Sequence, residues 1–120
     1  MPVNPVGADL KRFLAEDEGG PIVMLNLLRY RPGGERDYRD YVAQLRPFLD
    51  EIGAGVVYVG DCSTALVAPD SHRWDAVLLV RYPSRRAFSE MVANPAYQEI
   101  TRLRTGALEE AVLEATIPWA

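Results

Sequence analysis

The stretch VMLNLLRY, residues 23–30, is an apolar run with a single amide, Asn26, near its centre. Gly19, Gly20 and Pro21 precede it and the turn sequence RPGGE follows it, which indicates a buried strand over residues 22–29. A buried amide without partners costs about 1–3 kcal/mol. Asn26 is therefore satisfied by neighbouring backbone or a buried water, or it is placed to contact a ligand, and the sequence leaves both open.

Composition narrows the class of protein. The chain has 120 residues, of which 48% are apolar and 25% charged, as expected for one globular domain over residues 1–120. The net charge of −4 argues against nucleic acid and anionic membrane surfaces as partners. No apolar run is long enough to span a bilayer, the first residues do not resemble a signal peptide, and Cys62 has no second cysteine to pair with. A cytoplasmic location is the expectation.

The residues needed for common cofactors are scarce. One histidine and one cysteine do not supply the four ligands of a structural zinc site. The segment PGGERD lacks the spacing and the lysine of a phosphate-binding loop, and no G-x-S-x-G nucleophile elbow is present. The sequence predicts no metal and no cofactor.

On either side of the central stretch the pattern predicts an α+β, ferredoxin-like fold. A helix is expected over residues 7–18, and a βαββαβ core over residues 21–117 with a four-stranded antiparallel sheet. The core elements are a helix over residues 35–52 ending at Gly53, strands over 55–61, 74–82 and 111–119, and a second helix split at Asn94–Pro95, with Glu109 and Glu110 at a solvated helix end.

Alternation along the predicted strands makes both faces of the sheet apolar. Helices can cover only one of them, so the other should meet a second copy of the chain, giving a homodimer through the sheet. The uncovered face is predicted to carry Val23, Leu25, Leu27, Val57, Val59, Val77 and Leu79. The opposite, wetter face is predicted to carry Asn26, Tyr58, Trp74 and Tyr82 and to hold a small-molecule pocket.

Two segments carry a family resemblance. GPIVMLNLLRYRPGG (20–34) and WDAVLLVRYPSRRAFSEMVANPAYQEITRLRTGALEEAVL (74–113) are similar to the family described as domain of unknown function 1330, and the resemblance extends over about residues 8–117. It implies a dimeric α/β barrel with a site between sheet and helices. The wider superfamily includes isomerases, cofactor-free monooxygenases, haem enzymes and ligand-sensing domains, so fold alone does not select an activity. Because His72 lies in a loop rather than on a helix, haem is not expected.

The candidate site residues follow from these patterns. Asn26 is expected to hold a carbonyl or enolate oxygen, with Arg104 assisting electrostatically. His72 and Asp75 are candidate acid/base groups, although a histidine in such a loop is more often solvent-exposed. Tyr41, Tyr58 and Trp74 are expected to form the walls, although aromatic rings also fill ordinary cores.

Three functions fit this sequence. The first is a homodimeric, cofactor-free enzyme for isomerisation, cyclisation, proton transfer or monooxygenase-like chemistry on a small oxygenated molecule. The second is a non-catalytic binding or sensing module with the same pocket, and the third is a structural dimer with a filled core. The sequence identifies neither ligand nor reaction, because an enzyme needs a titratable group against the ligand and the positions of His72 and Asp75 are not fixed by pattern.

Overall fold

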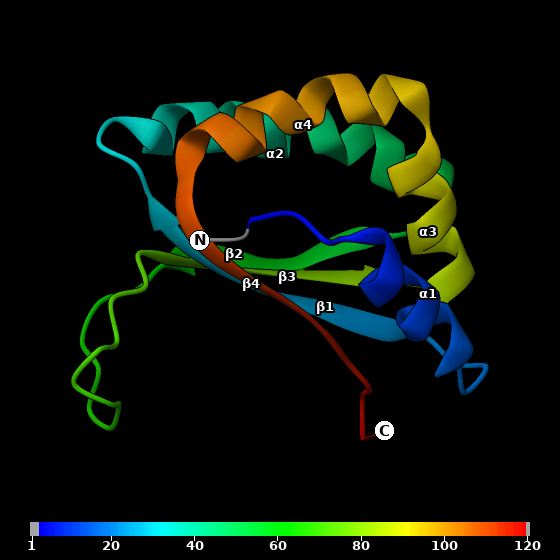
Figure 1. Cartoon of the computed structure of the whole chain (residues 1–120), viewed down its shortest axis with the longest axis horizontal. Coiled ribbons are helices and arrows are strands. Elements are labelled where there is room, and N and C mark those ends of the chain that lie inside the picture. The colour runs from blue at the N-terminus through cyan, green and yellow to red at the C-terminus, as the bar shows by residue number, and fades with distance from the viewer. Residues whose placement is uncertain (1–2, 120) are drawn as a thin grey trace.

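A computed structural model describes residues 3–119, and within them strand β1 (Ile22–Tyr30) has a neighbour on each side (Figure 1). The other elements are α1 (Gly7–Ala15), α2 (Gly34–Glu51), β2 (Gly55–Asp61), β3 (Ala76–Tyr82), α3 (Arg85–Ala93), α4 (Pro95–Ala107) and β4 (Leu108–Thr116). The strand order is β2-β3-β1-β4 and all pairs are antiparallel. This confirms the predicted α+β, ferredoxin-like fold with its N-terminal helix and split second helix.

Helices α2 and α4 lie side by side over one face of the sheet, with α3 at one end of this layer (Figure 1). The helix predicted over residues 35–52 forms as α2, and helical spacing places its buried apolar residues on one face, which includes Tyr38, Tyr41, Val42, Leu45 and Leu49. Gly53 adopts a φ of 72° just after α2, a left-handed conformation that glycine tolerates. The side chain of Asn94 accepts a hydrogen bond from Ala96 N (2.9 Å) and Pro95 follows it, so α4 begins as predicted.

Strand β4 begins at Leu108, earlier in the chain than the strand predicted over residues 111–119. The predicted strand over residues 111–119 is wrong at its start, because Leu108 is fully buried and enters the sheet directly after α4. Glu109 and Glu110 therefore lie on a strand and not at a helix end. The Glu110 carboxylate pairs with Arg29 on β1 at 2.8 Å, which stabilises this register across the sheet.

A β-bulge in β2 reverses part of the predicted side-chain alternation. Val56 pairs with Val80, but the register then shifts and Tyr58 pairs with Leu79. The extra residue, Val57, moves every later side chain to the opposite face. Tyr58 therefore lies on the face away from the helices, and Val59 lies on the helix side, so both predicted orientations were wrong.

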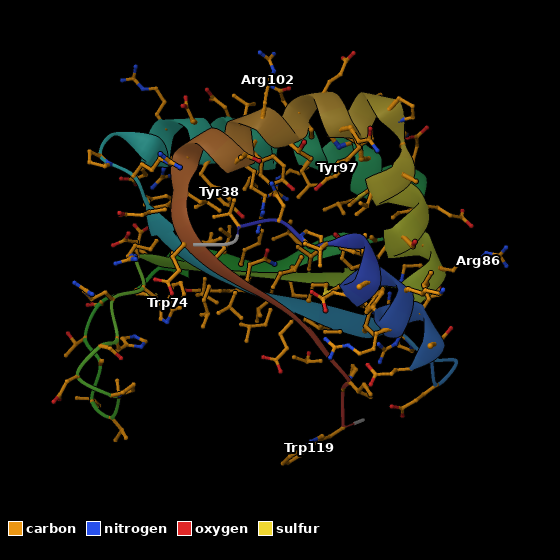
Figure 2. All side chains as sticks on the ribbon, viewed as in Figure 1. Tyr38, Trp74, Arg86, Tyr97, Arg102 and Trp119 are labelled. Atoms are coloured by element: carbon orange, nitrogen blue, oxygen red, sulfur yellow. The ribbon has the colours of Figure 1, made fainter. Side chains whose placement is uncertain are left out.

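The sheet face turned away from the helices is called the open face here. It carries an apolar centre that no helix of residues 3–119 covers (Figure 1), formed by Val23, Leu25, Leu27, Tyr58, Val77, Leu79 and Val112. The 62–75 loop and the segment after β4 extend on this same side, and the side chain of Trp119 projects away from the fold (Figure 2). Leu66 and Trp119 are both almost wholly exposed, at 92% and 105%.

None of the helices within residues 3–119 is both long enough and apolar enough to cross a lipid bilayer.

The close approach of α2 to the end of α4 depends on Gly34. A Cβ atom built at this position would collide with the backbone carbonyl of Ala107. The same carbonyl accepts a hydrogen bond from Arg31 N at 2.8 Å, which leaves it little freedom to move. Only a residue without a side chain fits this contact.

The substitution Gly34→Ala is expected to destabilise the fold by about 1–3 kcal/mol, because overpacking must displace backbone. The control Gly106→Ala is expected to stabilise it by about 0.5–1 kcal/mol, since nothing lies within 4 Å of a Cβ there and alanine favours a helix. Thermal melts measure both, at about 3–6 °C per kcal/mol for a domain of this size. Equal melting temperatures for the two variants would contradict the packing argument.

Candidate functional site

A pocket of about 260 Å³ lies between the helix side of the sheet and the helix layer. The floor comes from β1, β3 and β4, the walls from α2, α3 and α4, and one side from the residues that precede and begin α1. Its lining residues are Asn4, Pro5, Leu10, Met24, Asn26, Tyr41, Leu45, Leu78, Val80, Tyr82, Phe88, Val92, Tyr97, Gln98, Thr101, Arg104 and Leu113.

Asn26 lies at the centre of the floor. It pairs with Leu78 on β3 and Leu113 on β4, so strands on both sides hold its backbone. Its side chain is 6% exposed, and Nδ2 donates one long hydrogen bond to the Leu78 carbonyl, at 3.3 Å. Its Oδ1 accepts no side-chain or backbone hydrogen bond from residues 3–119. The amide therefore keeps hydrogen-bonding capacity on the side that faces the pocket.

Arg104 places a positive charge in the same pocket. It lies in the last turn of α4 and is only 5% exposed. Nη1 donates to the Val3 carbonyl and to Asn4 Oδ1, the latter at 2.9 Å. Within residues 3–119, Nη2 is buried beside the Tyr38 hydroxyl without a hydrogen bond of good geometry, and no carboxylate forms an ion pair with Arg104. Burying a guanidinium with an unused donor and no counter-ion costs free energy.

Two tyrosine hydroxyls complete the polar part of the pocket lining. Tyr41 Oη on α2 and Tyr97 Oη on α4 are 2.7 Å apart and share a hydrogen bond. Only one of the two protons lies between them, so the other remains available to a ligand. Burial raises the pKa of Tyr41 well above its ordinary value and also raises that of Tyr97. Both phenols are thus neutral hydrogen-bond donors at physiological pH and not bases.

The N-terminal segment closes one side of the pocket. Asn4 and Pro5 line it, and Asn4 Nδ2 donates to Thr105 Oγ1 on α4 at 2.9 Å. Helix α1 is fixed further along by Arg85, whose Nη1 donates to the Phe13 carbonyl at 3.1 Å and whose guanidinium lies over the Phe13 ring. The segment therefore contacts Arg104 at one end and is anchored on α3 at the other.

The structure brings together three of the seven residues proposed from sequence. Asn26, Tyr41 and Arg104 line the pocket, whereas Tyr58, Trp74, His72 and Asp75 do not. Tyr58 is on the open face because of the bulge in β2 and is 54% exposed. Trp74 and Asp75 precede β3, which begins at Ala76 and not at the predicted residue 74.

His72 and Asp75 lie at the end of the sheet, outside the pocket. His72 is exposed in the 62–75 loop. The Asp75 carboxylate accepts a hydrogen bond from Tyr30 N at 2.8 Å, so it caps the end of β1. The part of the chain that the structure describes consequently contributes no carboxylate and no imidazole to the pocket lining.

Tyr97 could have been found from the sequence and Tyr82 was assigned to the pocket face, whereas Asn4 could not have been predicted. Tyr97 and Arg104 are seven residues apart on one helix, a spacing that places both on the same face. Alternation along β3 placed Tyr82 on the same side as the pocket. Burial raises the pKa of its phenol. Asn4 belongs to a segment without periodicity, and no local signal places it against α4.

Residues that could hold a metal ion do not cluster. Within residues 3–119, no group of three or more His, Cys, Asp or Glu side chains has an arrangement suited to a metal.

Comparison with solved structures places the chain among α+β proteins of ferredoxin-like fold. Two crystal structures of a protein of unknown function from Rhodopseudomonas palustris, one of them methylated, have TM-scores of 0.88 and 0.90 and sequence identities of 32% and 33%. They match 98% and 99% of this chain and 97% and 96% of theirs. A dimeric ferredoxin-like protein of unknown function from Jannaschia sp. CCS1 shares the fold, with a TM-score of 0.64 and 13% identity over 82% of this chain and 100% of its own. A search of curated proteins finds no match.

Sequence identifies the family within this class. The family model "Domain of unknown function (DUF1330)" matches residues 28–115, nearly the whole of the core. The chain therefore belongs to the DUF1330 family, as its two characteristic segments suggested.

The buried tyrosines predict a loss of stability in alkali. Burial raises the pKa of Tyr38, Tyr41, Tyr82 and Tyr97 in the folded state, whereas an unfolded phenol ionises near pH 10. Below that pH both states keep their protons, and above it the unfolded state loses protons that the folded state retains. The free energy of unfolding should therefore fall above about pH 10, by up to about 1.4 kcal/mol per pH unit for each tyrosine.

Urea melts between about pH 8 and about pH 11, followed together with phenolate absorbance, measure this effect. The variant Tyr41→Phe should reduce the alkaline slope, because it removes a phenol whose pKa burial raises. Gradual appearance of phenolate from all tyrosines near pH 10 in the folded protein would contradict the prediction.

Proposed function

We propose that this protein binds a small oxygenated organic molecule in the pocket at Asn26. The observation that carries the proposal is that the pocket reaches a central amide with only one long hydrogen bond, to Leu78 at 3.3 Å. Asn26 Nδ2 can donate to a carbonyl or enolate oxygen, and Oδ1 can accept from a hydroxyl. The Arg104 guanidinium supports negative charge on the same ligand.

The pocket suits chemistry in which negative charge develops on an oxygen. Arg104, Asn26 and the phenol of Tyr41 or Tyr97 can all donate hydrogen bonds to such an oxygen, which is how an enolate is stabilised. Cofactor-free isomerisation or cyclisation through an enolate would use this arrangement. The proton must then move through the substrate or water, because the raised pKa values of Tyr41 and Tyr97 leave no lining group ready to act as a base.

The same observation favours a second candidate, a non-catalytic binding or sensing module. A sensor needs shape and hydrogen bonds but no acid or base against the ligand, and residues 3–119 contribute neither a carboxylate nor an imidazole to the pocket. Incubation of the protein with a bound ligand separates the two candidates. A product that forms only with wild-type protein supports the enzyme, and an unchanged ligand supports the module.

We further propose that two copies associate through the open face. The apolar centre of this face is uncovered in the monomer, and it is flanked by Arg29, whose Nε is buried without a partner in the described chain. The Jannaschia neighbour is described as dimeric. The exposed Trp119 lies on this side as well, where a second copy could cover it (Figure 2).

The substitution Asn26→Leu tests the ligand-facing role of the amide. If Asn26 serves a ligand, leucine should leave the melting temperature unchanged or raise it, because a poorly paired amide is replaced by apolar contact. The affinity for a ligand found by thermal-shift screening should fall by about 1–3 kcal/mol. Melting curves and calorimetric titration measure the two effects.

Asn94 provides a matched control, for which we expect a loss of stability with no change in ligand affinity. Asn94 caps α4 outside the pocket, so Asn94→Ala should cost about 0.5–2 kcal/mol of stability and leave ligand affinity unchanged. A large loss of stability in Asn26→Leu with unchanged affinity would show that Asn26 is a structural amide.

Association through the open face predicts a particle of about twice the 13.4 kDa chain mass at micromolar concentration. A stable interface would bury about 800 Å² or more per subunit. Leu25→Glu should weaken both association and folding, because the charge would lie in the centre of the interface. The control Gln44→Glu adds the same charge at an exposed position of α2, in the helix layer, and should change neither. Light scattering that shows a monomer for the wild-type protein would refute this architecture.

A further inference from the structure

We propose that the pocket selects a small monocarboxylate, with its carboxylate at Arg104 and a short apolar body against the mainly apolar rest of the lining. This inference rests on the proposed function, because it names the chemical class of the molecule that the same pocket binds. It is carried by three observations: the charge of the lining, the unused donor of the guanidinium, and the mainly apolar character of the rest of the lining.

The first observation is an uncompensated charge. Among the residues from 3 to 119 that line the pocket, Arg104 is the one that carries a full charge, and none is Asp or Glu. Its two acceptors, the Val3 carbonyl and Asn4 Oδ1, are neutral. Taking a charge out of water is favourable only when an opposite charge joins it, and a ligand anion would supply that charge.

The second observation is the position of the unused donor. Nη1 is occupied by the N-terminal segment, whereas Nη2 is buried and unpartnered within residues 3–119. The buried hydroxyl of Tyr38 lies beside the guanidinium without a hydrogen bond of good geometry, and the charge of Arg104 together with this side-chain contact lowers the pKa of Tyr38 against the larger effect of burial. One carboxylate oxygen can accept from Nη2 in a charge-assisted hydrogen bond. The neutral phenols nearby add donors and no competing anion.

The third observation is the composition of the lining. Tyr97 and Arg104 come from α4, and the Tyr41 hydroxyl lies 2.7 Å from that of Tyr97. The rest of the lining is mainly apolar, from Leu10, Met24, Val80, Phe88, Val92 and Leu113, with the polar side chains of Tyr82 and Gln98 among them. Ligand sites commonly measure roughly 300–1,000 Å³, so a pocket of about 260 Å³, slightly below that range, takes a small ligand. With a single cation and an otherwise mainly apolar lining, the described part of the site matches one anionic group and not two.

The test compares carboxylates with neutral isosteres. The probes are phenylacetate against phenylacetamide and hexanoate against hexanamide, titrated into the wild-type protein by calorimetry. Two-dimensional amide NMR locates the binding, since the side-chain amide signals of Asn26 are identified by their absence in Asn26→Leu. Each carboxylate is expected to bind about 10- to 100-fold more tightly than its amide, the usual effect of a charge-assisted hydrogen bond, and to shift the Asn26 signals.

Two arginine variants test whether Arg104 is the cause. Arg104→Gln retains donors but removes the charge, so the carboxylate and the amide should bind with nearly equal affinity. Arg102 lies two residues away on α4, and its side chain points outward from the helix layer (Figure 2). Arg102→Gln should therefore preserve the full preference for the carboxylate. The wild-type comparison stands by itself if Arg104→Gln does not fold.

The outcomes separate this inference from the proposed function. Amides that bind as tightly as carboxylates and shift the Asn26 signals would overturn the inference while supporting the proposed function. A preference for carboxylates that persists in Arg104→Gln, or that disappears in Arg102→Gln, would also overturn it. If no probe of either series binds or shifts the Asn26 signals, both the inference and the proposed pocket for small oxygenated molecules fail.

Discussion

The two-sided pairing of β1 is the constraint on which the site depends. Because β3 and β4 use the backbone hydrogen bonds of β1 on both sides, its side chains must alternate between the helix layer and the open face. Met24, Asn26 and Leu28 share the helix side, and a slip of one residue would turn all three outward. The burial of Met24 and Leu28 therefore fixes the amide of Asn26 in the floor of the pocket. The helices and the N-terminal segment build the remaining walls around that fixed group.

Local sequence patterns correctly predicted the features that depend only on residues close together in the chain. The buried stripe of α2, the left-handed Gly53 and the Asn94–Pro95 start of α4 all follow from periodicity and capping. The orientation of Tyr58 did not, because a single extra residue in β2 reverses the alternation and leaves no compositional mark. The approach of Asn4 to Arg104 was likewise hidden, since it joins residues 100 positions apart. Thus the sequence predicted the floor of the pocket but not the side that the N-terminal segment closes.

Arg104 shows how the fold tolerates a buried charge. The Val3 carbonyl and Asn4 satisfy one side of the guanidinium, so the cost of burial is reduced but not removed. A fully paired arginine would stabilise the protein more, yet it would have nothing left to offer a ligand. The segment that closes the pocket is also the segment that supplies these acceptors. A ligand carboxylate that accepts from Nη2 would leave these acceptors on Nη1 in place and add the missing negative charge.

The open face and the pocket lie on opposite faces of the same strands, because successive side chains along a strand point to opposite faces of the sheet. Leu25 and Leu27 face the open side while Asn26, between them, faces the pocket. A substitution at one of these leucines changes the surface available to a second copy without adding or removing a group in the pocket. The two faces nevertheless share one backbone, so covering the open face would restrain the strand that positions Asn26. Association can in this way support pre-organisation of the pocket although no residue of the open face touches the ligand.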